Sequence, residues 1–312
     1  MNQPSSTRIP IAVFAYSDTG HACLERLLDR GENVVLVATH EDSAGEQRWF
    51  PSVAELARSR GIEPMVFEQD GSPEAIARVR AAAPELLFSF YYRGVLPEEI
   101  LEIPRLGAYN VHGSLLPKYR GRAPVNWAVL KGETETGATL HVMTARPDAG
   151  DIVDQETVPI GPDDTAADVQ RRVTEAAVRV LERRLEDLKA GRVPRRPQEE
   201  SAATRFGRRR PEDGRIDWSR TASEIHDLVR AVTHPYPGAF TDVFGGGKTY
   251  VWRTRLPNLG AHDNFPGQVR REEGRLYVSC GDDYYVEILS LQRSGEEEVE
   301  ASRFSLNLRD TR

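Results

Sequence analysis

Cysteine is scarce in this chain, because only Cys23 and Cys280 occur among its 312 residues, far apart in the sequence. Their spacing fits no metal-ligand pattern, so we expect two reduced thiols. Long apolar runs are also missing, since no stretch approaches the roughly 18–20 apolar residues that cross a bilayer. The first ten residues contain no apolar signal core. We therefore expect a cytoplasmic protein without a membrane span.

Positive charge is outweighed by negative charge, with 41 Lys and Arg against 48 Asp and Glu and a net charge of −7. This balance disfavours a polyanionic partner such as tRNA, although a local basic cleft can still hold phosphates. We therefore expect no nucleic-acid partner. A hydrophobic content of 39% and a charged content of 29% are typical of a globular enzyme. The length predicts one large domain or two modest ones.

Short apolar runs alternate with helical patterns over the first ninety residues. Ser52, followed three residues later by Glu55, has the pattern of a capping box that starts a helix. Alternation at this spacing predicts βαβ units and a Rossmann-like α/β domain with a parallel sheet. Such sheets bind ligands at the carboxyl ends of their strands. The expected strands are 10–16, 33–39, 64–67 and 85–90, and the expected helices are 21–31, 52–60 and 73–82.

The second half begins with a long helical pattern over about 165–190, ended by Gly191. Residues 192–204 have no apolar period and are rich in Pro, Arg, Glu and Gln, which predicts a linker. A helix at 222–232 and several short strands follow, which predicts a small OB-like β-barrel domain. We therefore expect a catalytic domain at 1–200 and a second domain at 205–312. The expected strands are 239–244, 248–254, 267–271, 275–280 and 284–291.

Two short stretches contain the side chains for acyl transfer to an amine. Asn110 and His112 lie two residues apart after an apolar segment, and Asp148 lies in a Pro-Asp-Ala-Gly turn. An amide can donate to a developing oxyanion, a neutral imidazole can accept a proton, and a carboxylate can set the imidazole tautomer. Asn110 and His112 point to the same face if the chain is extended there. The chemistry needs no metal.

Each of these residues also has a plainer interpretation. An Asn or His after a strand is often a turn or packing residue, and we expect His141, on the strand before the Asp148 turn, to pack rather than react. The cations Lys118, Arg120 and Arg122 are typical of a solvated loop, and Ser114 can support the local turn by hydrogen bonding. The full string together with the Asp148 turn favours a site.

The string VHGSLLPKYRGRAPVNW (111–127) resembles the signature of the folate-dependent formyltransferases, with Asn110 before it and Asp148 after it in the family's order. The resemblance implies a catalytic trio of Asn110, His112 and Asp148. It also implies 10-formyltetrahydrofolate as co-substrate, with no metal. The residues implied to line the folate site are Gly94, Val95, Leu96, Arg122, Thr144, Ala145, Arg146 and Pro147.

Within this family, the chain most resembles the formyltransferase domain of bifunctional polymyxin-resistance proteins, which formylate UDP-4-amino-4-deoxy-L-arabinose during lipid A modification. Segments such as FSFYYRG, LKGETETGATLH and VRAVTHPYPGAF carry this resemblance. The chain shows no GxGxxG loop, so we expect no oxidative decarboxylation. Methionyl-tRNA formyltransferase is the alternative, supported by RPEDGRIDWSR and YPGAF. A folate-binding protein without catalysis is an alternative of another class.

The acceptor depends on the loop HEDSAGEQRWFPS (40–52), which is short and acidic where tRNA-acting relatives carry a basic insertion. Trp49 or Phe50 can stack on a uracil ring, with Tyr91 after the fourth strand nearby. Arg208 and Arg209, followed by Arg210, can bind a diphosphate. The alternatives are core packing for the two aromatics and a solvated hinge for the arginines. The oligomeric state is left open, with a homodimer among the alternatives.

Overall fold

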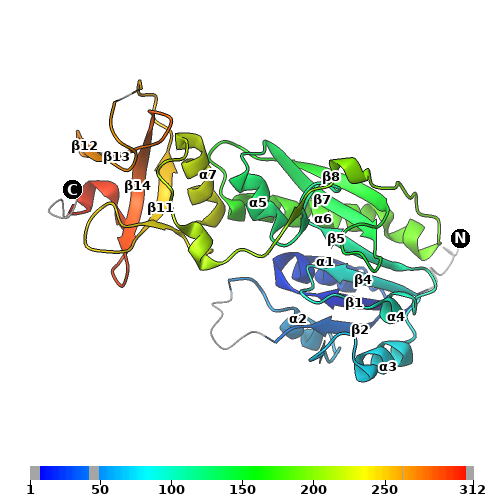
Figure 1. The fold of residues 1–312 in the computed structure, drawn as a ribbon. Helices are drawn as coiled ribbons and strands as arrows, with labels where there is room; N and C mark the ends of the chain where they lie inside the picture. The colour runs from blue at the N-terminus through cyan, green and yellow to red at the C-terminus, as the bar shows by residue number, and fades with distance from the viewer. Residues whose placement is uncertain (1–7, 42–48, 262, 307–312) are drawn as a thin grey trace, which may run out of the picture. The chain divides into compact units, whose positions relative to one another are not determined.

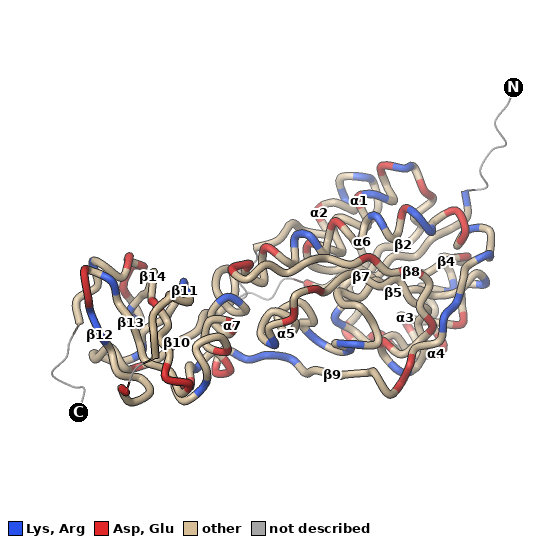
Figure 2. Tube along the Cα trace, turned by 90° about the horizontal axis from the view of Figure 1, so that it is seen from above, with Lys and Arg blue, Asp and Glu red and all other residues tan. Residues whose placement is uncertain are grey.

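The computed structural model describes residues 8–41, 49–261 and 263–306, and Figure 1 shows the fold. The chain forms two compact units. Unit 1 comprises Met1–Gly121, Thr136–Val158 and Arg171–Phe206, and unit 2 comprises Arg122–Glu135, Pro159–Gln170 and Gly207–Arg312. The division into 1–200 and 205–312 that the sequence suggests stays a prediction. Acidic and basic residues are interspersed along both units (Figure 2).

Unit 1 contains a seven-stranded sheet in the order β3-β2-β1-β4-β5-β7-β8. The first five strands of this order pair in parallel, which confirms the predicted parallel sheet. The order reverses direction between β1 and β4, the kind of switch point where ligands bind. The strands are β1 (Ile11–Ala15), β2 (Val34–Thr39), β3 (Met65–Val66), β4 (Leu86–Phe90), β5 (Ala108–His112), β7 (Glu135–Val142) and β8 (Ile152–Pro159).

The sheet is mixed at its far side, because β7 runs antiparallel to β5. The sequence alone predicted only parallel pairing. In the antiparallel register Asn110 lies opposite His141, and His112 lies opposite Thr139. Side chains of directly opposed residues lie on the same face of a sheet and within contact distance. The pairing therefore brings residues separated by about thirty positions in sequence to the end of β5.

The helices of unit 1 follow the sequence pattern closely. Ser52 caps α2 by accepting a hydrogen bond from the Glu55 N–H at 3.2 Å, as predicted. α1 begins at Ser17, directly after β1, rather than near residue 21. Gly20 allows this close approach, because a Cβ there would lie 2.9 Å from the Phe90 carbonyl oxygen. The helices are α1 (Ser17–Asp29), α2 (Val53–Ser59), α3 (Pro73–Ala82), α4 (Glu98–Leu101) and the long α6 (Ala166–Lys189), whose first five residues belong to unit 2.

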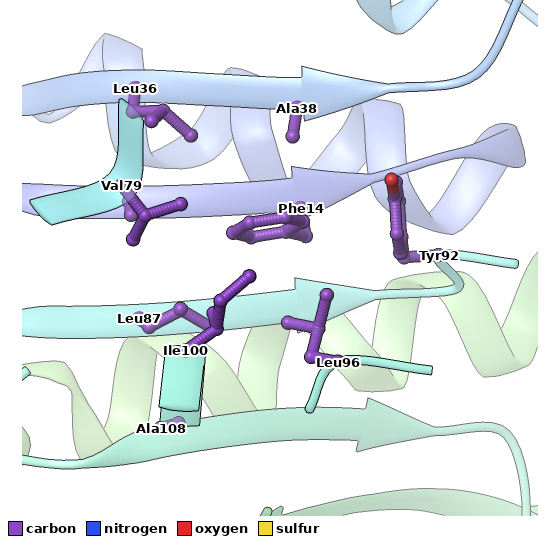
Figure 3. Close-up of a cluster of buried hydrophobic side chains, with 10 residues drawn as sticks. Phe14, Leu36, Ala38, Val79, Leu87, Tyr92, Leu96, Ile100 and Ala108 are labelled. Carbon is purple, nitrogen blue, oxygen red and sulfur yellow. The ribbon is translucent and has the colours of Figure 1, made fainter. Parts of the chain in front are cut away.

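A cluster of buried apolar side chains lies against the sheet of unit 1 (Figure 3). Phe14 of β1 and Leu87 of β4 are fully buried there, beside Ile100 of α4. Burying side chains of this size contributes roughly 1.5–3 kcal/mol each. Tyr92 extends the cluster beyond the end of β4, with its ring 5.3 Å from that of Phe14. The core thus holds the carboxyl ends of β1 and β4 in place, and the loops at this edge of the sheet begin there.

Unit 2 contains an antiparallel sheet in the order β10-β11-β14-β13-β12, with β15 paired to β14. This confirms the predicted β-rich C-terminal part. Helix α7 (Ala222–Val232) has the predicted bounds because Thr221 and Glu224 form a capping box at its start. The other elements are α5 (Pro124–Leu130), β10 (Ala239–Thr241), β11 (Thr249–Arg255), β12 (Val269–Glu272), β13 (Arg275–Ser279), β14 (Tyr285–Arg293), β15 (Val299–Glu300) and the 3₁₀ helices η2 (Pro211–Gly214) and η3 (Ala301–Arg303).

Short elements complete unit 1, where β6 (Arg120–Gly121) pairs in parallel with β9 (Arg205–Phe206) and the 3₁₀ helix η1 spans Glu200–Ala202. Across the three described ranges, no helix combines the length and apolar character that a membrane crossing requires.

Candidate active site

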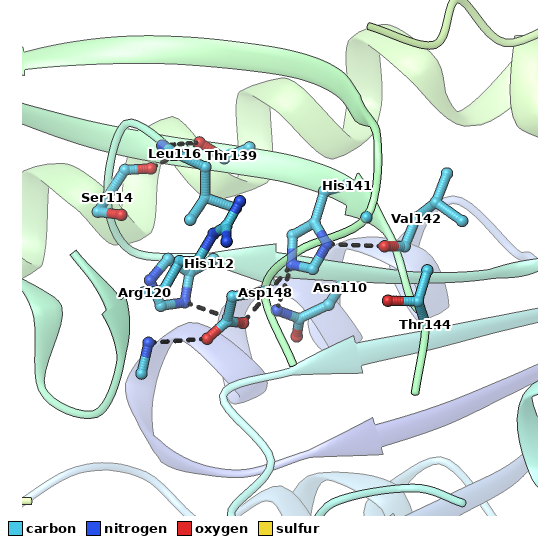
Figure 4. Close-up of polar contacts among 12 residues, drawn as sticks. Asn110, His112, Ser114, Leu116, Arg120, Thr139, His141, Val142, Thr144 and Asp148 are labelled. Carbon is cyan, nitrogen blue, oxygen red and sulfur yellow. Dashed lines mark hydrogen bonds and ion pairs between the residues drawn. The ribbon is translucent and has the colours of Figure 1, made fainter. Parts of the chain in front are cut away.

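Asn110, His112 and Asp148 come together in unit 1, although Asp148 is far from the other two in sequence. Asn110 and His112 lie at the carboxyl end of β5, and Asp148 lies in the turn between β7 and β8 (Figure 4). Asp148 Oδ1 is 3.5 Å from His112 Nδ1 and 3.7 Å from His141 Nε2. The structure therefore assembles the three residues that the sequence singled out, with His141 as a fourth member.

The hydrogen bonds of His112 fix which ring nitrogen carries the proton. Its Nε2 lies 2.8 Å from the carbonyl oxygen of Tyr119. A carbonyl only accepts, so Nε2 is the donor and Nδ1 is the basic nitrogen of the neutral ring. Nδ1 faces Asp148. A proton taken up by Nδ1 therefore lies beside the Asp148 carboxylate, which stabilises the resulting imidazolium.

Asp148 is held in an ionised state and in an unusual backbone conformation. Burial alone opposes ionisation, but His112, His141, the Gly121 N–H and Arg205 together bring the pKa of Asp148 below its ordinary value of 3.8. The Gly121 N–H donates to Asp148 Oδ2 at 2.8 Å. The residue has a φ of 59°, in the left-handed region. The turn thus presents a fixed negative charge to both histidines at neutral pH.

Asn110 has its amide oriented by His141. Its Nδ2 lies 3.0 Å from His141 Nε2, while His141 Nδ1 donates to the carbonyl of Val142 at 2.8 Å. Burial lowers the pKa of His141 to about 4, so the ring is neutral at neutral pH and its Nε2 accepts. One amide N–H of Asn110 is therefore committed to His141, which fixes the amide plane and aims the second N–H and Oδ1 elsewhere.

The turn after β5 is held by a separate set of hydrogen bonds. Ser114 Oγ donates to the carbonyl of Lys118 at 2.7 Å, as the sequence suggested for this residue. Thr139 of β7 donates to the carbonyl of Ser114 at 2.6 Å and accepts from the Leu116 N–H at 3.1 Å. These bonds fix the path from His112 to Tyr119, whose carbonyl in turn orients the His112 ring.

The three cations of this turn differ sharply in their surroundings. Lys118 and Arg122 are exposed, but Arg120 is only 5% exposed. Arg120 donates to Gln198 and Glu200, both about eighty residues away. The interpretation of all three as a solvated loop is therefore wrong for Arg120.

The residues that the resemblance assigns to a folate site lie in two places in unit 1, with Arg122 in unit 2. Gly94 follows β4 and has no room for a side chain, since a Cβ would lie 1.7 Å from Asp70 Oδ2. Val95 is 62% exposed, whereas Leu96 is buried in the core cluster. Thr144, Ala145 and Arg146 are exposed, and Pro147 half-buried, on the loop that leads to Asp148.

The aromatic residues proposed to bind the acceptor lie at the edge of the sheet formed by the carboxyl ends of β1, β4 and β5. Trp49 is 42% exposed and packs edge-on against Phe50, which in turn packs against Tyr16 at the end of β1. Phe50 is half-buried, so it supports the exposed Trp49. Tyr91 directly follows β4 with a φ of 56°. Most of the acidic loop at 40–52, namely 42–48, lies outside the described residues.

The arginine run 208–210 belongs to unit 2. Arg208 is exposed, whereas Arg209 is half-buried, with its guanidinium 4.9 Å from the ring centre of Trp127 and one N–H donated to the Asp213 carbonyl. Arg210 is exposed, and its backbone N–H donates to the Asp213 carboxylate at 2.7 Å. Arg208 and Arg210 are thus the exposed side chains of the run.

Sequence reasoning missed His141, Arg120, Gln198 and Glu200 as parts of the site. His141 packs, as expected, but it also orients Asn110. The antiparallel register of β7 on β5 places His141 beside Asn110. The periodicity of the sequence does not encode this register. Gln198 and Glu200 lay in a segment whose composition suggested a linker. Within the described ranges, no cluster of three or more His, Cys, Asp or Glu side chains is arranged to hold a metal ion.

Comparison with known proteins gives two family matches that together span most of the chain. The family described as Formyl transferase matches residues 7–185. The family described as Formyl transferase, C-terminal domain, matches residues 209–308.

Solved structures with the same fold include two formyltransferases and HypX. WlaRD, a sugar 3N-formyl transferase solved with dTDP and 5-N-formyl-THF, is 19% identical, with a TM-score of 0.67 over 90% of this chain and 97% of that one. An N-formyltransferase from Helicobacter canadensis, in complex with folinic acid and dTDP-3-aminofucose, is 21% identical, with a TM-score of 0.67 over 90% and 98%. HypX from Aquifex aeolicus is 19% identical, with a TM-score of 0.61 over 98% of this chain and 49% of that one.

Proposed function

This chain belongs to the formyl transferase family, and from that premise we propose that it moves a formyl group from 10-formyltetrahydrofolate to the amine of a nucleotide-linked amino sugar. UDP-4-amino-4-deoxy-L-arabinose, formylated at its 4-amine, is the acceptor we propose. The observation that carries the proposal is the cluster in which an oriented amide, Asn110, lies beside a His112–Asp148 pair.

In the proposed reaction, the acceptor amine attacks the formyl carbon and forms a new C–N bond. The carbonyl oxygen becomes an oxyanion, to which the second N–H of Asn110 donates. The amine proton passes to His112 Nδ1, where the ionised Asp148 stabilises the imidazolium. The C–N bond to the folate then breaks, and the leaving nitrogen takes a proton from the same imidazolium. The His112–Asp148 pair therefore takes up one proton from the amine and gives one proton to the leaving nitrogen.

The co-substrate fits the residues of the sheet edge. Backbone groups around Gly94 and Val95, together with the exposed loop 144–147, would hold the pterin and position the formyl group near Asn110. Two structural neighbours bind a formylated folate, which supports this assignment.

Three observations support a nucleotide sugar as the acceptor. The same two neighbours bind dTDP or a dTDP-linked amino sugar. Trp49 offers an exposed ring on which a base can stack. The net charge of −7 disfavours tRNA, whose binding depends on clustered cations. The choice of uracil and of a 4-amino arabinose comes from the sequence resemblance, as does a role in lipid A modification and polymyxin resistance. A cytoplasmic location stays a prediction from the lack of long apolar runs.

An acceptor panel tests the proposal. The protein is supplied with 10-formyltetrahydrofolate and, separately, with UDP-4-amino-4-deoxy-L-arabinose, with dTDP- and GDP-linked amino sugars, and with charged initiator tRNA, while release of tetrahydrofolate is followed. We expect release with the UDP sugar, and none from the Asn110→Ala control. Release with another nucleotide sugar alone would correct the acceptor. Release with tRNA alone would support methionyl-tRNA formyltransferase, and no release, with folate still bound, would support a non-catalytic folate-binding protein.

A further inference from the structure

Residues 196–206, which we call the strap, are bound along unit 1 rather than free. Most of the strap falls in the segment whose composition predicted a linker. At its start, Arg196 exchanges two backbone hydrogen bonds with Ile152, at 2.8 and 2.9 Å. At its end, β9 pairs with β6, and the ring of Phe206 stacks on that of Tyr119 at 5.0 Å. The strap therefore spans from the loop after Asp148 to the turn after His112.

Gln198 joins the Asp148 turn to the buried Arg120. Its Nε2 donates to the backbone carbonyls of Asp148 and Gly150, at 2.8 and 2.7 Å. Its Oε1 accepts from Arg120 Nε at 3.1 Å and from a terminal nitrogen of Arg120 at 2.8 Å. The Gln198 side chain thus links the backbone of the catalytic turn to the strand β6.

Glu200 provides the counter-charge that lets Arg120 be buried. The two form a bidentate ion pair with nitrogen-to-oxygen distances of 2.9 and 3.1 Å. The hydrogen bonds from Arg120 are the main reason that the pKa of Glu200 lies below its ordinary value. A buried guanidinium is tolerated only when it is paired and hydrogen-bonded. Arg120 therefore has a fixed position against which Gln198 can hold the turn.

Thr204 holds the other side of the site. Its Oγ1 accepts from the Tyr119 N–H at 2.8 Å, and its carbonyl accepts from the Arg120 N–H at 2.9 Å. Tyr119 supplies the carbonyl that accepts from His112 Nε2. The strap thus contacts the segments that supply both partners of His112, the Tyr119 carbonyl at Nε2 and the Asp148 carboxylate at Nδ1.

We infer that the strap is a positioning element, through which Gln198 and Thr204 hold the Tyr119 carbonyl and the Asp148 carboxylate on the two ring nitrogens of His112. Both side chains act through other residues rather than on the substrate. A displacement of about 1 Å in a catalytic constellation can cost roughly 100-fold in rate, so a few well-placed hydrogen bonds matter. The inference rests on the proposed function of the trio.

Matched variants test the inference. Thr204→Val removes the hydroxyl while keeping the shape, and Thr204→Ser restores a hydroxyl. Gln198→Met removes the amide while keeping most of the volume. Ser201→Ala is the control within the strap, because the Ser201 hydroxyl bonds only to Glu199 of the strap itself among the hydrogen bonds described. All four variants are made in the full-length protein, and their folding is checked by thermal unfolding.

Two readouts separate positioning from a general structural role. We expect Thr204→Val and Gln198→Met to lower kcat about 10- to 100-fold with both KM values within about three-fold, and Thr204→Ser and Ser201→Ala to match the wild type. The second readout follows the His112 ring signals by NMR across a pH titration, with no acceptor present. We expect the pH dependence of these signals to change in the first two variants only.

The inference is overturned if Thr204→Val and Gln198→Met leave both kcat and the His112 titration as in the wild type and only lower the unfolding temperature. The NMR readout also distinguishes this failure from failure of the proposed function. If the wild type turns over no acceptor, the proposed function fails, while the titration still decides whether the strap orients His112.

Discussion

Asn110 Nδ2 and His141 Nε2 lie 3.0 Å apart across the antiparallel pair of β5 and β7. This contact makes a buried histidine the acceptor that orients the proposed oxyanion donor. Because the Nδ1 proton of His141 is committed to the Val142 carbonyl, His141 can only accept at Nε2 while it is neutral. The orientation of Asn110 therefore depends on the protonation state of its neighbour.

Replacement of His141 tests this relationship. His141→Gln can place an amide oxygen near the position of Nε2 and keep an acceptor for Asn110, so we expect kcat within about three-fold of the wild type. His141→Leu removes the acceptor and releases the amide, and we expect kcat to fall at least about ten-fold, part of the roughly 10²–10³-fold worth of an oxyanion donor. Steady-state kinetics measure both. Equal activity of the two variants would show that Asn110 does not need this acceptor.

His141 also predicts an acid sensitivity of folding. Its pKa is lowered from 6.5 to about 4 by burial. As the pH falls from about 6.5 to 4, His141 therefore becomes protonated in the unfolded chain but stays neutral in the native state. Stability contributed by the neutral ring is therefore present above this window and is lost on acidification. Between pH 7 and pH 5 we expect a loss of about 2 kcal/mol in the free energy of unfolding from this residue.

Urea unfolding at the two pH values measures this effect. His141→Gln cannot titrate, so we expect it to lose about 2 kcal/mol less than the wild type on going to pH 5. The pKa of Asp148 is also lowered from its ordinary value of 3.8. The stability that its carboxylate contributes is therefore lost at a pH below the compared range of about 7 to 5. The same pH dependence in variant and wild type would contradict the assignment.

Asp148 is expected to act through its charge. Asp148→Asn retains an oxygen that can accept from the Gly121 N–H but removes the negative charge beside His112 Nδ1. The comparable change in a Ser-His-Asp triad costs about 10⁴-fold, and we expect a fall in kcat of about 100-fold or more here, with the fold retained. Asp151→Asn, three residues along the same loop, is the matched control. A kcat near the wild-type value would remove Asp148 from the mechanism.

Trp49 is expected to bind the acceptor and not the folate. Trp49→Ala removes an exposed ring, and base stacking on an aromatic side chain is worth roughly 1–3 kcal/mol, so we expect the KM of the nucleotide sugar to rise about 5- to 150-fold. The dissociation constant of the folate is expected to stay unchanged. Phe265→Ala, which removes an 83% exposed ring of unit 2, is the control. Unchanged kinetics in Trp49→Ala would refute the stacking role.

The sequence predicted those parts of the molecule that depend on local patterns. The buried face of α6 follows from apolar spacing and the capped start of α2 from Ser52 with Glu55, and both helices are confirmed. The four-residue α4 has too few positions to show a period, and α5 starts at Pro124 after Ala123, which provides no side-chain cap. Neither helix was predicted, because both are too short to show a clear apolar period.

The site was predictable only in part for the same reason. Asn110, His112 and Asp148 stand in distinctive strings, and the structure brings them together. Their catalytic roles stay a prediction. His141 reaches Asn110 through a strand register, and Gln198 reaches Asp148 across fifty residues. Such non-local contacts leave no periodic trace in the sequence, so a segment rich in Pro and charge was interpreted as a linker although it binds the Asp148 turn.

The rate of tetrahydrofolate release by His112→Ala, with the acceptor that the wild type uses best, tests the central claim most directly. Asn110→Ala is measured beside it, and the circular dichroism and unfolding temperature of each variant establish that it is folded. The account predicts that each variant stays folded and loses at least about 10³-fold in kcat. Turnover near the wild-type rate in either folded variant would contradict it.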